Sequence, residues 1–459
     1  MIFEQHYLDC LSQASYFIGD ETTGQAVVVD PRRDISPYLD SAEKHNMTIK
    51  FVLETHFHAD FLSGHLEMAA ATGATIGYGS KADTEFESMK FADGDQISLG
   101  DVVLEIRHTP GHTPESISIV VFENPDSAPY AVLTGDTLFI GDVGRPDLLS
   151  SKGVTADELA VSLYNSLHHQ LLTLPDETLV YPAHGAGSSC GKNLSTDTSS
   201  TIGVQRATNY ALAPMTEDEF VQVVTAGQTA PPAYFAYDAK LNRELRPLLD
   251  ESMAPAPMSF NEVIAAQGEG AVIVDTRTPE DFALGHISGS VNIGMTGRYA
   301  EFAGGIITAG TPMIIVADDG DALEAKNRLA RIGFDNVLGS LESPLKAMTD
   351  NPESMSTSSR LDVEGVRQAI ETIPDLQLVD VRQPGETEGG FVDGATLLPL
   401  TKLTEDMDTL DRTKRTIIYC AGGFRSSIAA SHLVSNGFED VSDLLGGYGA
   451  WDAAHEKTA

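Results

Sequence analysis

The chain has 459 residues, of which 42% are hydrophobic and 21% are charged, a size that predicts about two to four domains. Its formal net charge of −38 disfavours nucleic acid and anionic membranes as partners, because both repel an acidic surface. No apolar run is long enough to span a membrane, no secretory signal is visible, and only three distant cysteines occur, which favours a reducing cytoplasm.

The first part of the chain alternates short apolar runs with helical stretches. Residues 51–55 and 131–134 are predicted to be strands, and each run ends beside a side chain that could bind a metal. Residues 229–232 and 252–257 are the best linker candidates because of their prolines. We therefore expect a first domain over residues 1–245.

Six potential metal ligands follow these strands or lie in nearby loops. The motif Thr-His-Phe-His-Ala-Asp-Phe alternates imidazole and carboxylate side chains at His56, His58 and Asp60. The three further candidates are His112, Asp136 and His184. A lone histidine usually has a structural role, but six such side chains in loops predict a metal site.

The order H-x-H-x-D, followed by His, Asp and His, resembles the metallo-β-lactamase superfamily over roughly residues 1–240. The resemblance implies an αββα sandwich with the metal at one edge of two sheets. In the dinuclear hydrolases of this superfamily, such as glyoxalase II, a histidine directly follows the motif aspartate. Here that position is Phe61, so we expect one metal rather than two zinc ions.

Two histidines and one carboxylate on one face leave open positions for substrate and O₂, the arrangement that non-haem Fe(II) oxygenases prefer. The resemblance to persulfide dioxygenases implies that His56, His112 and Asp136 bind one Fe(II) per chain. It leaves outer hydrogen-bonding roles to the other three side chains, which are His58, Asp60 and His184. Spacing alone does not decide which three bind the metal.

A second segment of the first domain bears on the substrate. Gly-Arg-Pro-Asp at residues 144–147 resembles the G-R-x-D segment of the same family, whose arginine helps to hold the thiol. The guanidinium of Arg145 suits a carboxylate of glutathione or a phosphate of coenzyme A. A salt bridge to Asp142 or Asp147 is an equal alternative. Cys190 lies either near the thiol entrance or in an inert buried position.

An internal repeat follows the proline-rich segment. Asp275 and Asp380 end similar apolar runs 105 positions apart, and Gly333 and Gly437 begin similar segments 104 positions apart. Each copy reads as strand, loop, strand, helix and strand, which predicts two small α/β domains. The expected domain ranges are 258–350 and 359–457, with the serine-rich segment 354–359 between them.

The second copy delivers Cys420 from an apolar strand into a glycine-bearing loop that also holds Arg425. Backbone N–H groups and a helix amino terminus in such a loop favour a thiolate or persulfide anion. The loop resembles that of a rhodanese domain, with Asp380 and Arg382 in its usual strand-end motif. Related phosphatases have a loop one residue longer, so we expect Cys420 to carry sulfur with Arg425 beside it.

The first copy departs from this pattern. Ala-Asp-Asp-Gly-Asp at residues 317–321 occupies the place of the loop, without a cysteine and with acidic side chains that would repel a persulfide anion. We therefore expect a catalytically silent rhodanese-like domain before the active one.

These features predict an iron persulfide dioxygenase that converts a thiol persulfide and O₂ to thiol and sulfite. Cys420 would exchange sulfur between thiosulfate and persulfide. A zinc-dependent thioester hydrolase is the alternative enzyme, and a sulfur carrier without oxygen chemistry is the third. The sequence leaves open the preferred thiol, the direction of sulfur transfer and the oligomeric state, a homo-oligomer included.

Overall fold

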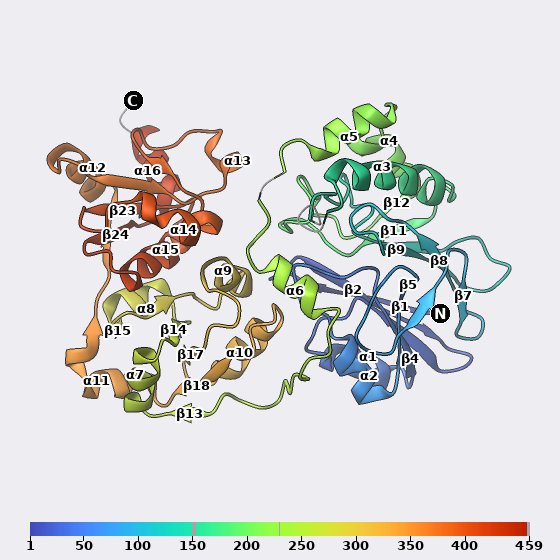
Figure 1. Cartoon of the computed structure of the whole chain (residues 1–459), viewed down its shortest axis with the longest axis horizontal. Coiled ribbons are helices and arrows are strands. Elements are labelled where there is room, and N and C mark those ends of the chain that lie inside the picture. Colours follow the sequence, from blue (N-terminus) through green and yellow to red (C-terminus); the bar gives the residue numbers. More distant parts are fainter. Residues whose placement is uncertain (149–152, 229, 457–459) are drawn as a thin grey trace. The chain divides into compact units, whose positions relative to one another are not determined.

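The structure is a computed structural model, and it describes residues 1–148, 153–228 and 230–456. The chain divides into two units (Figure 1). One unit contains Met1–Asp250 and Arg331–Gly333, and the other contains Glu251–Ala330 and Phe334–Ala459. Of the two expected linkers, the one at 229–232 begins at Thr229, which lies outside the described residues.

The first unit is built on two six-stranded sheets. The first sheet has the order β1-β2-β3-β4-β5-β6, with β1 to β3 antiparallel and β3 to β6 parallel. Its strands are β1 (Ile2–Leu8), β2 (Gln13–Asp20), β3 (Gln25–Val29), β4 (Thr48–Leu53), β5 (Thr75–Gly79) and β6 (Met89–Phe91).

The second sheet has the order β12-β11-β10-β9-β8-β7. Its described pairs are antiparallel except β10 with β11, which run parallel. Its strands are β7 (Gln96–Ser98), β8 (Val103–His108), β9 (Ile117–Phe122), β10 (Ala131–Gly135), β11 (Leu179–Pro182) and β12 (Ser200–Thr201).

Alternating side chains place these sheets face to face with helices outside. Tyr16 and Ile18 of β2 enter the core that both sheets share, whereas Phe17 between them packs with residues of α1 (Ser36–Lys44) and α2 (His65–Thr72). A third core joins the second sheet to helices on its outer face. The remaining helices of this unit are α3 (Ala156–Ser166), the π-helix η2 (Leu167–Leu171), α4 (Ile202–Thr208), η3 (Tyr210–Leu212), α5 (Glu217–Thr225) and α6 (Phe235–Leu241). The expected αββα sandwich is confirmed.

The second unit contains two five-stranded parallel sheets. The first has the order β13-β18-β17-β14-β16, with β13 (Pro257–Met258), β14 (Val272–Asp275), β16 (Val291–Asn292), β17 (Met313–Val316) and β18 (Val337–Leu341). Its helices are α7 (Phe260–Gly268), α8 (Pro279–Leu284), α9 (Tyr299–Ile306), α10 (Ala322–Ala330), α11 (Pro344–Asp350) and η4 (Pro352–Ser354).

The other sheet repeats this design in the order β20-β24-β23-β21-β22. Its strands are β20 (Ser359–Leu361), β21 (Gln377–Asp380), β22 (Thr396–Leu397), β23 (Thr416–Tyr419) and β24 (Val441–Leu444). Its helices are α12 (Val363–Thr372), α13 (Pro384–Thr387), α14 (Leu400–Asp406), η5 (Met407–Thr409), α15 (Phe424–Ser435) and α16 (Gly447–Glu456). The two expected small α/β folds are present.

The serine-rich connection between these sheets is itself folded. β19 (Met355–Ser356) pairs with β15 (His286–Ile287), and β20 begins at Ser359. Ser288 and Ser356 share a hydrogen bond of 2.7 Å between their hydroxyl groups. The serines therefore serve strand pairing at this connection.

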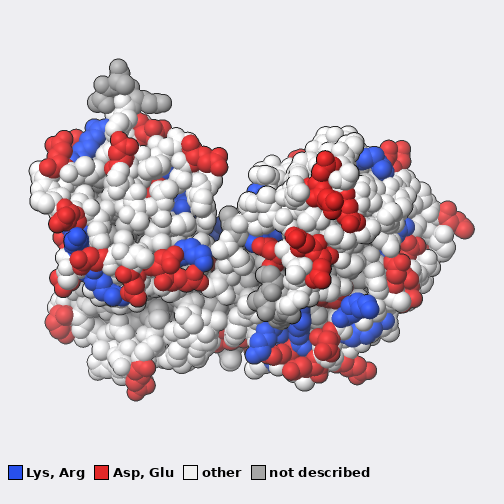
Figure 2. All heavy atoms as spheres, turned by 45° about the horizontal axis from the view of Figure 1, so that its top comes forward, with Lys and Arg blue, Asp and Glu red and all other residues white. Residues whose placement is uncertain are grey.

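Acidic side chains are spread over the visible surface of both units, with fewer basic ones between them (Figure 2). This distribution matches the net charge of −38. None of the helices in the described ranges combines the length and apolar character needed to cross a bilayer.

Candidate metal centre and sulfur-carrying loop

Strand ends deliver the predicted metal ligands of the first unit to one place. The histidine motif follows β4, Asp136 directly follows β10, and His184 comes two residues after β11. Because β10 and β11 run parallel, their carboxyl ends lie at the same edge of the sheet. His112 lies in the loop between β8 and β9 and completes the group.

Three of the predicted ligands form a compact buried group. The Nε2 atom of His112 lies 3.4 Å from Oδ2 of Asp136, and Nε2 of His56 lies 3.7 Å from the same oxygen. One ligand atom from each of the three side chains lies within 4.8 Å of the others. All three side chains are buried. The arrangement can hold one metal ion.

The other three predicted residues form a second buried group beside the first. His58, Asp60 and His184 also offer atoms within 4.8 Å of one another. His184 joins the two groups, because its Nε2 lies 2.8 Å from Oδ2 of Asp60 and its Nδ1 lies 2.7 Å from Oδ1 of Asp136. The structure thus brings all six predicted residues together.

The first group has the electrostatic properties of a metal site. Nε2 of His56 and Oδ2 of Asp136 are buried and have no hydrogen-bond partner among the described residues. Such an atom costs about 1–3 kcal/mol if nothing binds it. Burial and the neighbouring His58 hold the pKa of His56 well below its usual value, which favours a neutral imidazole. Burial opposes ionisation of Asp136, but His184 and His56 lower its pKa far below the ordinary range.

Thr55, the backbone of Arg145 and Asp30, of which the sequence did not single out Asp30, orient these imidazoles. Thr55 Oγ1 donates to Oδ2 of Asp30 at 2.8 Å and lies 2.9 Å from Nδ1 of His56. The backbone oxygen of Arg145 lies 2.9 Å from Nδ1 of His112. Such partners fix which ring nitrogen faces a metal. Asp30 ends a Val-Val-Val strand, and that strand-end position is the signal that could have revealed it.

Glu54 and His65 form a further buried group that the sequence did not reveal. Nε2 of His58 lies 3.5 Å from one oxygen of Glu54, and Nδ1 of His65 lies 3.3 Å from the other. Burial raises the pKa of Glu54 and lowers that of His65. Glu54 thus contacts the histidine motif through His58 and connects it to His65.

Phe61 occupies the position after the motif aspartate and is fully buried. Its ring centroid lies 4.3 Å from that of His58 and 6.3 Å from that of His184. A hydrocarbon ring therefore packs where a histidine would offer another ligand.

The second unit presents Cys420 immediately after β23, as expected. Its Sγ atom accepts a hydrogen bond of 3.1 Å from the backbone N–H of Gly423 and lies 3.6 Å from Oγ of Ser426. Gly423 has a φ of 97° and precedes α15, a conformation that glycine adopts without steric strain. The thiol is buried at the amino terminus of this helix.

Arg425 lies in the same loop, and its charge is already paired. Its two terminal nitrogens donate to the carboxylate of Glu386 at 2.7 and 2.6 Å. Arg425 holds the pKa of Glu386 below its usual value. The sequence did not reveal this partner, because Glu386 is 39 positions away and carries no motif.

The silent copy lacks these features at the corresponding positions. Asp275 pairs with Val316 across β14 and β17, just as Asp380 pairs with Tyr419 across β21 and β23. Ala317 therefore corresponds to Cys420. The next two residues, Asp318 and Asp319, are exposed. The position of the thiol is thus taken by an alanine, and the catalytic silence of this copy stays a prediction.

Comparison with known proteins extends these findings. The rhodanese-like domain family matches residues 259–343 and 362–454. The mitochondrial persulfide dioxygenase of Bos taurus is 30% identical over 217 residues, which cover 46% of this chain and 75% of the relative. The chain belongs to the metallo-β-lactamase-fold family that includes the persulfide dioxygenases, and it carries two rhodanese-like domains.

Other similar proteins are named as hydrolases or lactamases and not as dioxygenases. A cytoplasmic hydroxyacylglutathione hydrolase of Arabidopsis thaliana is 38% identical over 181 residues, covering 39% of this chain and 66% of the relative. A crystal structure of a metallo-β-lactamase from Staphylococcus aureus is 32% identical, with a TM-score of 0.67, and covers 74% of this chain and 99% of its own.

In this chain Arg145 forms the salt bridge to Asp147 that the sequence analysis gave as an alternative to substrate binding. Its guanidinium donates to both carboxylate oxygens of Asp147, at 2.7 and 2.8 Å, and to the backbone oxygen of Ser189 at 3.2 Å. Cys190 is buried near Asp136 and His184, and burial raises the pKa of its thiol. Cys10 is only partly buried.

Proposed function

We propose that the first unit is a non-haem iron persulfide dioxygenase in which His56, His112 and Asp136 bind the metal. The observation that carries this proposal is the pair of buried atoms without partners, Nε2 of His56 and Oδ2 of Asp136, beside Nε2 of His112. Two imidazoles and one carboxylate are the ligand set of Fe(II) oxygenases. When bound, ferrous iron would supply open coordination positions for a sulfur anion and O₂.

Outer roles for His58, Asp60 and His184 are supported by the directions of their nitrogens. Burial opposes a charge on His184, but the carboxylates of Asp136 and Asp60 raise its pKa well above the usual value. His184 lies between the two carboxylates, with Nδ1 2.7 Å from Asp136 and Nε2 2.8 Å from Asp60, which suits a residue that orients a metal ligand. Nε2 of His58 is directed toward Asp30, at 3.1 Å from Oδ1.

The proposed overall reaction converts a persulfide RSSH, O₂ and water to the thiol RSH, sulfite and two protons. The terminal sulfur loses the electrons that O₂ gains, and the S–S bond breaks. Asp136 stays ionised throughout and balances positive charge at the centre. The imidazoles of His56 and His112 keep their orientation through Thr55 and the backbone of Arg145.

We retain Arg145 as the predicted binding residue for the organic part of a glutathione or coenzyme A persulfide. A carboxylate or phosphate of that thiol would replace Asp147 on the guanidinium, because both anions fit the same bidentate geometry.

Cys420 would connect this reaction to thiosulfate. Its thiolate attacks the sulfane sulfur of thiosulfate, a new S–S bond forms, and sulfite leaves with the electron pair of the old bond. A thiol RSH then takes the sulfur as RSSH and returns Cys420 to the thiolate form, with the reverse sequence equally balanced. Tethering on one chain raises the effective concentration of each product at the other site.

Anaerobic reconstitution with Fe(II) and an oxygen-electrode assay with glutathione persulfide test the dioxygenase. We expect O₂ uptake matched by sulfite, and we expect both to disappear in Asp136→Ala. Arg145→Lys should raise KM for the persulfide more than it lowers kcat, because a lysine loses the bidentate contact. Iron-loaded protein that takes up no O₂ with either glutathione or coenzyme A persulfide would overturn the proposal.

A zinc thioester hydrolase is the second candidate, favoured by the 38% identity to the hydroxyacylglutathione hydrolase. Phe61 opposes a dinuclear centre, since its ring fills the position of the additional ligand. Phe61→His should raise the bound zinc from about one to about two ions per chain, as metal analysis would show. Thioester hydrolysis by the unaltered zinc form, with an iron form inert toward O₂, would establish the hydrolase instead.

A further inference from the structure

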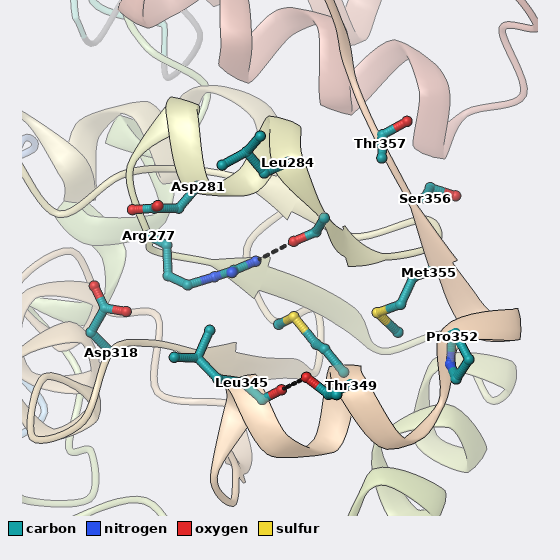
Figure 3. Close-up of a pocket in the computed structure, with 12 residues that line it drawn as sticks. Arg277, Asp281, Leu284, Asp318, Leu345, Thr349, Pro352, Met355, Ser356 and Thr357 are labelled. Atoms are coloured by element: carbon teal, nitrogen blue, oxygen red, sulfur yellow. Dashed lines mark hydrogen bonds between the residues drawn. The ribbon is translucent and has the colours of Figure 1, made fainter.

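A cavity of about 830 Å³ opens in the silent rhodanese-like domain, at the carboxyl ends of its central strands (Figure 3). Arg277 follows β14 and Asp318 follows β17, while Asp281 and Leu284 come from α8. The opposite wall comes from α11 and includes Leu345. The cavity is distinct from the metal centre and does not include Cys420.

Arg277 directs an unused donor into this cavity. Nε and Nη2 of its guanidinium donate to the carboxylate of Asp275, and Nη2 also donates to the backbone oxygen of Gly285 at 2.9 Å. Nη1 has no hydrogen-bond partner within the described part of the chain, although the residue is only 4% exposed. Figure 3 shows the guanidinium lying along the cavity. A guanidinium nitrogen that lines a cavity and has no protein partner can donate to an oxygen acceptor of a ligand.

The active domain closes the corresponding position. Nη1 of Arg382 donates to the backbone oxygen of Glu386 at 3.0 Å, and the ring of Tyr448 covers the guanidinium at 4.1 Å. No aromatic ring stacks on Arg277 among the described residues. The active domain has a smaller cavity of about 390 Å³ against the matching helix α16, lined by Tyr448 and Trp451, so the two cavities differ in size and in how the arginine is covered.

Two exposed carboxylates give one end of the cavity a negative charge. Asp281 and Asp318 flank Arg277, whose own charge is balanced by Asp275 (Figure 3). Neither Asp281 nor Asp318 forms an ion pair with any described cation. In the active domain Glu386 occupies the place of Asp281 and pairs with Arg425, but Ala322 replaces that arginine here. This end of the cavity favours an ammonium group.

The rest of the cavity combines apolar side chains with the hydroxyl groups of Thr349, Ser356 and Thr357. Leu284 is 81% exposed and Leu345 is 70% exposed, and both line it together with Met348 and Met355. Large aliphatic side chains exposed beside a cavity commonly mark a binding surface. They would cover an apolar side chain adjoining the charged end.

We propose that this cavity binds a small peptide-type zwitterion with an apolar side chain. The ammonium lies between Asp281 and Asp318, and the neighbouring carbonyl or carboxylate oxygen accepts from Nη1 of Arg277. The apolar side chain packs on Leu345 and Met348. The volume exceeds the needs of one amino acid and suits a peptide of a few residues. This binding function does not depend on the proposed dioxygenase.

Isothermal titration of the full metal-loaded chain with the tripeptide Leu-Gly-Gly tests the proposal. We expect a Kd of about 0.1–1 mM, as is typical of a small polar ligand in an open site. Removing the ammonium by N-acetylation, or the side chain in Gly-Gly-Gly, should each weaken binding about tenfold. Absence of Leu-Gly-Gly binding at about 10 mM overturns the proposal.

Matched variants identify the site. Asp281→Asn combined with Asp318→Asn should weaken binding about tenfold, and Leu345→Trp should weaken it similarly by filling the cavity. Glu269→Gln and Leu338→Trp are the controls, because both residues are exposed in the same domain but do not line the cavity. Sulfur transfer by Cys420 should stay unchanged in all of them and reports intact folding. Binding that survives every cavity variant would place the peptide elsewhere and overturn the assignment.

Discussion

The two rhodanese-like domains share a sheet order and an Asp-Arg brace but differ in everything that surrounds sulfur. Arg277 forms an ion pair with Asp275 at the end of β14, and Arg382 forms the corresponding ion pair with Asp380 at the end of β21. In the later domain a cysteine, Cys420, directly follows the neighbouring strand β23, whereas an alanine, Ala317, follows the corresponding strand β17. The brace therefore belongs to the fold, and the sulfur chemistry belongs to the loop. The silent domain keeps the first without the second.

The difference extends to the pairing of charges. In the active domain Glu386 pairs with Arg425, whereas in the other domain the corresponding Asp281 forms no ion pair with a described cation and interacts with Arg277 only through its charge. The domain without the cysteine thus also lacks the arginine and has the larger of the two cavities.

The largest effect is expected when the cysteine is removed from the later domain and introduced at the corresponding position of the earlier one. Cys420→Ser should lower thiosulfate:thiol sulfur transfer about a thousandfold or more, because no other described loop presents a thiol on a helix amino terminus. Adding Ala317→Cys to that variant should restore nothing, since Asp318 and Asp319 oppose a persulfide anion. Oxygen uptake serves as the control and should stay near its original rate. Recovery of transfer through residue 317 would contradict the loop-based explanation.

A backbone change beside Cys420 should also affect sulfur transfer. Gly447 has a φ of 57°, and an added Cβ would lie 2.3 Å from the backbone oxygen of Cys420. Gly447→Ala should therefore displace the loop, lower sulfur transfer about tenfold and cost about 1–3 kcal/mol of stability. Gly385→Ala is the control, because nothing lies within 4 Å of its added Cβ. Assays of transfer with denaturant unfolding would show whether the two variants differ.

Removal of the carboxylate of Glu386 would leave the guanidinium of Arg425 without its ion-pair partner and should change the reaction with thiosulfate. Glu386→Gln should raise kcat/KM for the thiosulfate dianion about threefold to tenfold, because the guanidinium becomes available to an anion. The gain should shrink at high salt, since exposed charges are screened. Glu388→Gln in the same segment is the control. An unchanged kcat/KM would show that Arg425 does not contact the anionic donor.

The smallest expected effect concerns the stability of the same ion pair. Arg425 lowers the pKa of Glu386 below its ordinary value of 4.5, so the pair stabilises the fold above that pH. Its contribution is lost as pH falls through the lowered pKa. Because Glu386 is partly exposed, we expect only about 0.5 kcal/mol between the unaltered chain and Glu386→Gln at neutral pH. Urea unfolding at several pH values would reveal a difference that vanishes in acid, whereas a pH-independent one would contradict the ion-pair explanation.

The sequence predicted what strand ends and local spacing encode. The six side chains of the metal region and Cys420 each follow an apolar run or sit in a short motif, so pattern alone located them. The partners that orient them come from distant segments. Asp30 acts through Thr55, and Glu386 reaches Arg425 only after the chain has folded. Arg145 showed the opposite difficulty, since its motif was visible but its choice between Asp147 and a substrate depends on tertiary geometry.

One parallel pair of strands has a consequence for how this enzyme family can vary. Because β10 and β11 run in the same direction, the chain must travel back along the sheet between Asp136 and His184, and α3 and η2 lie on that return. The helical part of this return, α3 and η2, can change in length or composition while both ligand-bearing ends stay where the strands leave them. Natural diversification of the molecule should therefore concentrate in these helices, far more than in the two strands that flank them.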